Sequence, residues 1–234
     1  MNEITQGFWD AWALILFFDP DLYEIIFLSL RVTVTAVVIA SLIGLPIGAL
    51  LAVNRFRHRR FVIALLNALM GLPPVVVGLF VYMLLSRAGP LGGFGLLFSP
   101  SAMIIAQVII ITPLIASISH QTVRDLWANY HDLLISLNTT RAQRISALLW
   151  DSRRALLTAT LAGFGRAIGE VGAIIIVGGN IDHATRVLTT AIALETGKGN
   201  FAFAMGLGMV LIMLAIIVNL LIHNLTKTEQ ASTW

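Results

Sequence analysis

Long apolar runs, separated by short polar segments, follow one another along most of the chain. A helix that crosses the hydrocarbon core of a bilayer needs about 20 mostly apolar residues. Five stretches qualify, and they are Thr33–Val53, Phe61–Leu85, Ala102–Ser119, Leu156–Val177 and Phe201–Ile222. The pattern predicts an all-α membrane protein with about five transmembrane helices.

A sixth apolar piece, Phe8–Phe18, is shorter and is followed directly by Asp19 and Pro20. It contains Trp9 and Trp12, and indole rings favour the headgroup region of a bilayer. Its length favours a helix that lies in the membrane interface over a helix that crosses the membrane. A sixth span is the alternative.

The composition supports a membrane protein. Of the 234 residues, 58% are hydrophobic and 12% are charged, whereas a soluble domain carries about 25% charged residues. A bilayer, unlike a soluble core, accommodates this many apolar side chains. The chain has no cysteine, which excludes disulfides, thiol nucleophiles and Cys-ligated metals. Lys and Arg exceed Asp and Glu only by 15 to 12, so no nucleic-acid partner is expected.

Basic residues gather on one side of the predicted spans. Asn54–Arg60 holds four arginines, His120–Ala155 holds five, and Lys227 follows the last span. The other side holds four basic residues, Arg31, Arg87, Arg186 and Lys198. Because cytoplasmic loops are enriched in Lys and Arg, the first side is predicted to be cytoplasmic. The N-terminus then lies outside and the C-terminus lies in the cytoplasm, in a multi-pass protein of the inner membrane.

Two longer connections lie on the predicted outer side. Arg87–Ser101 is rich in Gly and Pro, which is typical of a loop. Gly178–Asn200 contains an apolar patch, Val187–Leu194, which is too short to span a bilayer and predicts a re-entrant or interfacial helix. The chain shows no internal repeat. Residues 1–234 are therefore predicted to form a single transmembrane domain, with its core over about residues 25–225.

The connection from His120 to Ala155 is the longest polar stretch of the chain, with about 36 residues. Neighbouring membrane helices usually need a connection of only about two to eight residues. Within it, Asn138 predicts a turn between two amphipathic helices, and Thr139 or Thr140 caps the second helix. Their apolar faces hold Leu133, Leu134 and Leu137, and then Ile145, Leu148 and Leu149. A short amphipathic helix held away from the bilayer is suited to dock a cytoplasmic partner.

The place of this connection resembles that of the EAA loop in ABC importer permeases of the MetI-like type, whose pattern begins E-A-A-x(3)-G. Asp132 stands at the Glu position and Asn138 at the Gly position, while two leucines replace the two alanines. The resemblance implies a cytoplasmic coupling helix that docks an ATPase. The implied docking residues are Asp132, Leu133, Leu134, Leu137, Asn138, Arg141 and Ile145.

A second segment carries a more specific resemblance. The sequence GFGRAIGEVGA, Gly163–Ala173, is similar to the F-x-R-A-x-G-E-x-G-A signature of permeases for inorganic oxyanions. The likeness covers most of residues 30–222 and is nearest to tungstate-type permeases, with molybdate and sulfate permeases as relatives. It implies the type I ABC importer permease fold. It also implies gating or packing roles for Gly163, Phe164, Arg166, Gly169, Glu170 and Gly172.

Arg166 and Glu170 are four residues apart in the fourth predicted span. A lone charge at the centre of a membrane helix costs about 2.5–3.5 kcal/mol, and i,i+4 spacing on a helix lets two opposite charges pair. Three interpretations stay open. The pair serves helix packing, or it stabilises one of two transport states, or Arg166 contacts the transported anion.

Glycines and prolines inside the spans predict close packing and irregular backbone. Gly44-x3-Gly48 and Gly165-x3-Gly169 place small residues one turn apart, which lets helices approach closely within or between subunits. Proline interrupts the hydrogen bonding of a helix, so it predicts either a kink or backbone groups that face a polar pathway. The prolines concerned are Pro73, Pro74 and Pro113.

Several kinds of site are not expected in this chain. Its sequence holds no GxxxxGK[ST] run and no Ser/His/Asp or HExxH set, so neither ATP binding nor catalysis is predicted. No cofactor is expected in the chain itself, and ATP and Mg²⁺ would bind to a partner. No metal site is expected either, since no ligand-type spacing occurs among His58, His120, His131, His183 and His223.

These features predict the membrane subunit of an ATP-driven importer of an inorganic oxyanion, with tungstate ahead of molybdate or sulfate. The resemblance implies two copies of the chain, two cytoplasmic ATPase subunits, an extracytoplasmic oxyanion-binding protein and alternating access. The alternatives are a secondary transporter or channel for a small anion driven by an ion gradient, and an intramembrane enzyme. Secondary transporters place ionisable residues near mid-membrane for ion coupling, and this chain offers little beyond Arg166 and Glu170.

Overall fold

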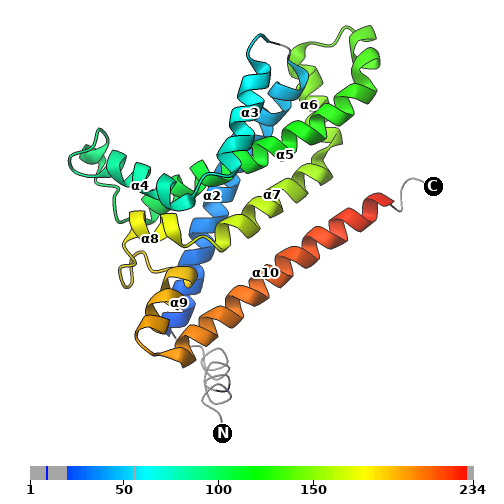
Figure 1. Cartoon of the computed structure of the whole chain (residues 1–234). Coiled ribbons are helices and arrows are strands. Elements are labelled where there is room, and N and C mark those ends of the chain that lie inside the picture. The colour runs from blue at the N-terminus through cyan, green and yellow to red at the C-terminus, as the bar shows by residue number, and fades with distance from the viewer. Residues whose placement is uncertain (1–8, 10–19, 55, 231–234) are drawn as a thin grey trace. The chain divides into compact units, whose positions relative to one another are not determined.

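The computed structural model describes Trp9, residues 20–54 and residues 56–230 (Figure 1). Regular structure in these ranges is helical, and no strand occurs in them. The predicted interfacial piece Phe8–Phe18 lies outside the described residues apart from Trp9.

The helices follow one another with short connections (Figure 1). They are α2 (Pro20–Val53), α3 (Arg59–Met70), α4 (Pro74–Leu85), η1 (Gly92–Phe94), α5 (Pro100–Ser136), α6 (Arg141–Asp151), α7 (Arg153–Ile168), α8 (Gly172–Gly178), α9 (Leu188–Gly197) and α10 (Phe201–Gln230).

Three of these helices contain enough apolar residues to cross a membrane, namely α2, α5 and α10. The pairs α3 with α4 and α7 with α8 each reach that length together, across a short break. Among the described residues the number of spans is therefore up to five, if each pair forms one span. The predicted all-α membrane fold is confirmed.

Two predicted spans are not single helices. Phe61–Leu85 is divided between α3 and α4, because Pro73 and Pro74 lack the N–H groups that would continue α3. Leu156–Val177 is divided between α7 and α8 at Gly169–Val171, a break that the hydropathy pattern does not predict. Pro113 lies inside α5 and does not end it.

The two helices predicted within His120–Ala155 are present, but the third predicted span, Ala102–Ser119, does not end as a helix near Ser119. α5 continues through His120 as far as Ser136, and α6 begins at Arg141. The helix extends beyond the apolar stretch because one of its faces is still covered. Val123 is fully buried there, and Leu126 and Trp127 pack against the same cluster.

Contacts between residues divide the chain into two compact units. Unit 1 consists of residues 1–36, 73–107 and 167–219, and unit 2 of residues 37–72, 108–166 and 220–234. Helices α2, α5, α7 and α10 each contribute residues to both units, so the division follows no boundary along the sequence. The single transmembrane domain stays a prediction.

Unit 1 holds α4, α8 and α9. α4 packs on α8 so closely that a Cβ atom at Gly78 would lie 2.7 Å from the Cα of Ala173. α9 lies beside the first turns of α2 and α10 (Figure 1). Their shared core consists of Leu22, Ile25, Leu188, Ala191, Leu207 and Val210. The predicted helix at Val187–Leu194 is therefore confirmed as a helix, α9, and its relation to the membrane stays a prediction.

Unit 2 is built around the contact of α2 with α5. A Cβ atom at Gly48 would lie 2.6 Å from the Cβ of Ser119 and 2.7 Å from the backbone nitrogen of His120. The predicted close-packing role of Gly44 and Gly48 is thus realised inside the chain. Arg59 holds the last turn of α2, since its Nε donates to the carbonyl of Leu51 at 2.6 Å.

Candidate functional site

The break between α7 and α8 carries the oxyanion-permease signature. α7 ends at Ile168, and α8 begins at Gly172. Between them lies Glu170, which is 6% exposed. Its Oε1 accepts a hydrogen bond from the backbone N–H of Ala173 at 3.2 Å, so the carboxylate satisfies a free donor in the first turn of α8.

Side chains from two other helices hold the same break. Gln107 of α5 donates from Nε2 to the carbonyl of Ala167 at 3.2 Å, in the last turn of α7. Thr189 of α9 donates from Oγ1 to the carbonyl of Glu170 at 2.9 Å. The carbonyl of Ala167 also accepts the backbone N–H of Glu170 at 3.1 Å, so main-chain and side-chain donors together hold this break. Sequence reasoning missed Gln107 and Thr189, because their partners are distant in sequence.

The predicted signature residues have different surroundings. In unit 2, Gly163 faces α5, where an added Cβ would lie 2.9 Å from side-chain carbons of Ile111 and Ile115. In unit 1, Gly172 faces Val75 of α4, with 2.6 Å between an added Cβ and Cγ2. Both glycines thus lie in close contact with a neighbouring helix, and the choice between a gating and a packing role stays a prediction.

The remaining signature residues lie near the end of α7. Phe164 is half-buried, Arg166 is exposed, and Gly169 is exposed in the turn that follows the helix. Because α7 ends before Glu170, one continuous helix does not carry Arg166 and Glu170, or Gly165 and Gly169. The mutual pairing of Arg166 with Glu170 stays a prediction.

Pro73 and Pro74 start α4. Pro73 is its N-cap residue and Pro74 its first residue, a position where proline is favoured because the N–H would have no helical partner. The carbonyl of Pro73 accepts the backbone N–H groups of Val76 and Val77 at 3.0 and 3.4 Å. The predicted interruption of the second span is confirmed, and a pathway role for Pro73, Pro74 or Pro113 stays a prediction.

The end of α5, the turn and α6 form the predicted docking helices. Asn138 has a φ of 51°, the left-handed conformation that the sequence predicted for the turn. Thr140 caps α6, because its Oγ1 accepts from Gln143 N at 3.4 Å and the Gln143 side chain accepts from Thr140 N at 2.8 Å. This reciprocal capping box fixes where α6 begins.

Burial sorts the predicted docking residues into two groups. Leu134 and Ile145 pack against the core cluster of unit 2, beside the fully buried Leu148. Leu133 and Leu137 are 55% and 64% exposed. Three polar members of the predicted set are also exposed, and they are Asp132, Asn138 and Arg141.

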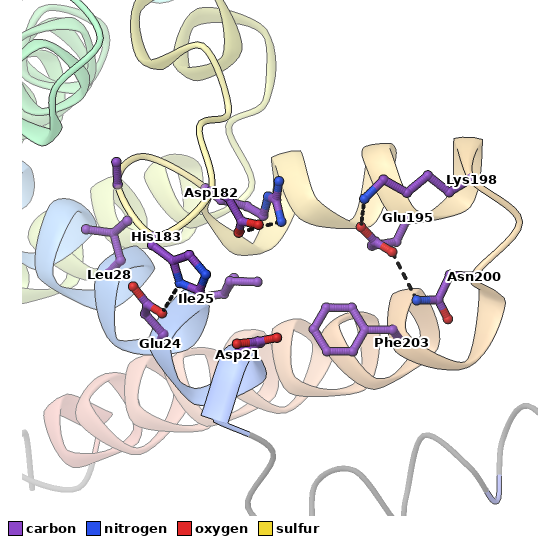
Figure 2. Close-up of a pocket in the computed structure, with 12 residues that line it drawn as sticks. Asp21, Glu24, Ile25, Leu28, Asp182, His183, Glu195, Lys198, Asn200 and Phe203 are labelled. Atoms are coloured by element: carbon purple, nitrogen blue, oxygen red, sulfur yellow. Dashed lines mark hydrogen bonds and ion pairs between the residues drawn. The ribbon is translucent and has the colours of Figure 1, made fainter.

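Unit 1 also contains a pocket of ≈ 300 Å³ that sequence reasoning did not find (Figure 2). It gathers charged side chains from the start of α2, the segment before α9 and the end of α9. In the predicted orientation this pocket lies at the outer ends of the spans. Its charged residues are Asp21, Glu24, Asp182, His183, Arg186, Glu195 and Lys198.

Opposite charges in the pocket are paired. Figure 2 shows His183 facing Glu24, with 2.8 Å between Nδ1 and Oε2. Lys198 Nζ lies 2.7 Å from Glu195 Oε1, and Asn200 Nδ2 donates to the other oxygen of Glu195 at 3.0 Å. The hydrogen bond from Lys198 lowers the pKa of Glu195, against the effect of burial.

Asp21, Glu24 and His183 each offer one metal-ligand atom, and these atoms lie within 4.8 Å of one another. All three residues are exposed, and exposed acidic groups commonly occur without an ion. The sequence did not suggest this grouping, because His183 is far from the two acids in sequence. The expectation of no metal site stays a prediction.

Known proteins resemble this chain over nearly its whole length. Residues 44–228 match the family described as the inner membrane component of binding-protein-dependent transport systems. The chain is 39% identical to the tungstate uptake system permease protein TupB of Peptoclostridium acidaminophilum, over 97% of this chain and 100% of that protein. It is 35% identical to the protein of the same name from Campylobacter jejuni, over 97% and 95% of the two chains.

A third relative is a probable anion ABC transporter permease protein of Haloferax volcanii, which is 40% identical over 86% of this chain and 88% of that protein. These similarities include both the docking helices and the broken fourth span. The chain therefore belongs to the family of binding-protein-dependent transport system inner membrane components.

Proposed function

We propose that this chain is the membrane permease of an ABC importer that moves an inorganic oxyanion into the cytoplasm, with tungstate as the first candidate and molybdate or sulfate as the next. The observation that carries the proposal is the similarity to two tungstate permeases over 97% of the chain. The signature Gly163–Ala173 supports the same class of substrate.

In this proposal, two copies of the chain pair with two cytoplasmic ATPase subunits, which bind ATP and Mg²⁺. The docking surface is the turn between α5 and α6. Leu133 and Leu137 support it, because they are apolar and more than half exposed at a point where a polar surface would be expected. Leu134 and Ile145 anchor the two helices to the core of unit 2.

Closure of the ATPase dimer would draw the two docked turns together and open the permease outward, and hydrolysis would reset it. An extracytoplasmic binding protein would deliver the anion at the outer ends of the spans. The pocket of unit 1 is not suited to recognise the anion. Its four acidic residues outnumber its two permanently charged bases, Arg186 and Lys198, and a negative field disfavours an anion.

The test is uptake into proteoliposomes that contain the permease with the ATPase and binding protein of its own transport system. We expect ATP-dependent accumulation of tungstate, and no accumulation when the ATPase carries an inactivating substitution in its nucleotide-binding loop. Molybdate and sulfate, each offered in competition, rank the substrates.

Uptake driven by a proton or sodium gradient without ATP would support the secondary transporter or channel instead. ATP-dependent uptake of a substrate other than an oxyanion would overturn the substrate class but keep the ABC mechanism. The two parts of the proposal therefore fail separately.

A further inference from the structure

A small polar cavity lies in unit 1 beside the break between α7 and α8. It offers ≈ 10 Å³ to the centre of a water-sized molecule, which is close to the minimum of about 10–15 Å³ that one water needs. Oxygen-bearing side chains that line it are Ser29, Thr33, Gln107, Glu170 and Thr189.

One residue that lines this cavity, Gln107, carries a buried polar atom without a partner among the described residues. Gln107 is 4% exposed, and its Oε1 has no hydrogen-bond partner among the described residues. The orientation of the amide is fixed, because Nε2 donates to the carbonyl of Ala167, which can only accept. If the amide were turned round, Gln107 Oε1 would lie against the carbonyl oxygen of Ala167, and neither oxygen can donate. Oε1 is thus a buried acceptor, and a buried acceptor without a partner destabilises the folded state.

We propose that this cavity is a binding site for a single water molecule, which donates a hydrogen bond to Gln107 Oε1 and a second one to an oxygen of Glu170 or Thr189. The site gives Gln107 a complete set of partners, with the carbonyl of Ala167 on one side and the water on the other. The water thereby belongs to the structure that holds the end of α7 next to the signature carboxylate.

The lining distinguishes water from a metal ion. A hard cation needs about six oxygen ligands around it, and apolar side chains occupy much of this wall, namely Val32, Met103 and Ile174. A buried water needs only about two to four polar partners. The cavity meets the second requirement and not the first.

Met103 provides the test, because it lines the cavity and is 0% exposed. Radiolysis generates hydroxyl radicals from bound water, so a methionine beside a bound water is oxidised even when it is buried. The experiment exposes the complete transporter complex in detergent to an X-ray beam and measures oxidation of Met103 by mass spectrometry. We expect Met103 to be oxidised in the wild-type protein.

Two variants separate bound water from transient opening of the protein. Gln107→Leu removes the buried acceptor and puts an apolar side chain in its place, so the water loses one of its two proposed partners and oxidation of Met103 should fall. Gln107→Asn keeps the amide and adds room, so oxidation should persist. An unlabelled Met103 in the wild-type protein, or equal labelling in the wild type and Gln107→Leu, would overturn the proposal.

A direct measurement covers the case in which the leucine variant does not fold. A cryo-electron microscopy map of the wild-type complex, at a resolution that shows ordered waters, should contain density within hydrogen-bond distance of Gln107 Oε1. A well-resolved Gln107 without such density would contradict the water site.

Discussion

Gly48 and Gly165 are both glycines inside long helices, but their surroundings differ. An added Cβ at Gly48 would meet the backbone of α5 and the Cβ of Ser119, and neither can rotate away. Nothing lies within 4 Å of the corresponding position at Gly165. Intrinsic helix propensity favours alanine over glycine by about 1 kcal/mol at both positions. Packing therefore decides the sign of the effect.

We predict that Gly48→Ala destabilises the protein by about 1–3 kcal/mol, which is the usual cost of overpacking. Gly165→Ala, the matched control, should leave stability unchanged or raise it slightly. Thermal unfolding of both variants in detergent measures the difference. If Gly48→Ala is as stable as the wild type, α2 and α5 lie further apart than the 2.6 Å between the added Cβ and the Cβ of Ser119 indicates. A destabilised Gly165→Ala would indicate a contact with another copy of the chain.

His183 makes the outer pocket sensitive to pH. The hydrogen bond to Glu24 is the main cause that raises the pKa of His183. The negative charges of Glu24, Asp182 and Asp21 raise it further, whereas desolvation lowers it. A group whose pKa is higher in the folded state binds its proton more tightly on folding. Its stabilising contribution is complete below the unfolded pKa of about 6.5 and is lost as the pH rises through the folded pKa.

We predict that His183→Asn lowers the unfolding temperature at acidic pH and has no effect at alkaline pH. Asparagine suits the position, because His183 has a φ of 53° and Asn tolerates this left-handed conformation. Unfolding temperatures of the two proteins, compared from about pH 5.5 to about pH 9, test the sign. Glu24→Gln should weaken the same pH dependence, because Asp182 and Asp21 still raise the pKa of His183, and a difference that grows with pH would contradict the assignment.

At the scale of elements, hydropathy predicted which segments form long apolar helices but not where these helices begin and end. α5 continues to Ser136 because Val123 and its neighbours pack in the core of unit 2, and this depends on tertiary contacts. The break after α7 was missed for the same reason. Gln107 and Thr189 stabilise it from α5 and α9, and no proline marks it in the sequence.

The turn at Asn138 and the cap at Thr140 were predicted correctly, because both depend on local chemistry. Which face of the docking helices is free was not predictable. The sequence pattern grouped Leu134 and Ile145 with Leu133 and Leu137, whereas only the last two are mainly exposed. This division changes the expected effect of substitutions.

We predict that Leu137→Asp abolishes co-purification of the ATPase and leaves the permease folded, because the side chain is 64% exposed. Ile145→Asp should instead reduce the yield of folded permease, because it places a charge without a partner against the core cluster. Affinity purification of the complex and size-exclusion profiles of the permease distinguish the two outcomes.

Leu91→Asp is the matched control for Leu137→Asp, since Leu91 is also exposed, at 41%, but lies in the predicted outer loop. It should not affect binding of the ATPase. If the complex survives Leu137→Asp, or if Leu91→Asp disrupts it as well, the docking surface lies elsewhere.

For the whole molecule, the asymmetry of basic residues predicts an orientation that hydropathy cannot supply. One side of the predicted spans has ten Lys and Arg residues and the other side has four. The positive-inside rule places the larger group in the cytoplasm. In this orientation the proposed docking turn would lie in the cytoplasm, where an ATPase subunit could reach it.

The absence of cysteine from the sequence makes this orientation testable, because one introduced cysteine is a unique label. Gly93→Cys fits the outer loop, where nothing lies within 4 Å of the added Cβ, and Ser146→Cys lies on the exposed side of α6. We predict that a membrane-impermeant maleimide labels Gly93→Cys in spheroplasts and labels Ser146→Cys only after permeabilisation.

Asn2→Cys, which precedes Phe8–Phe18 in the sequence, should be labelled from outside if that piece lies in the interface. Labelling of Asn2→Cys only after permeabilisation would establish a sixth span, and reversed labelling of Gly93→Cys and Ser146→Cys would overturn the orientation and, with it, the proposed docking surface.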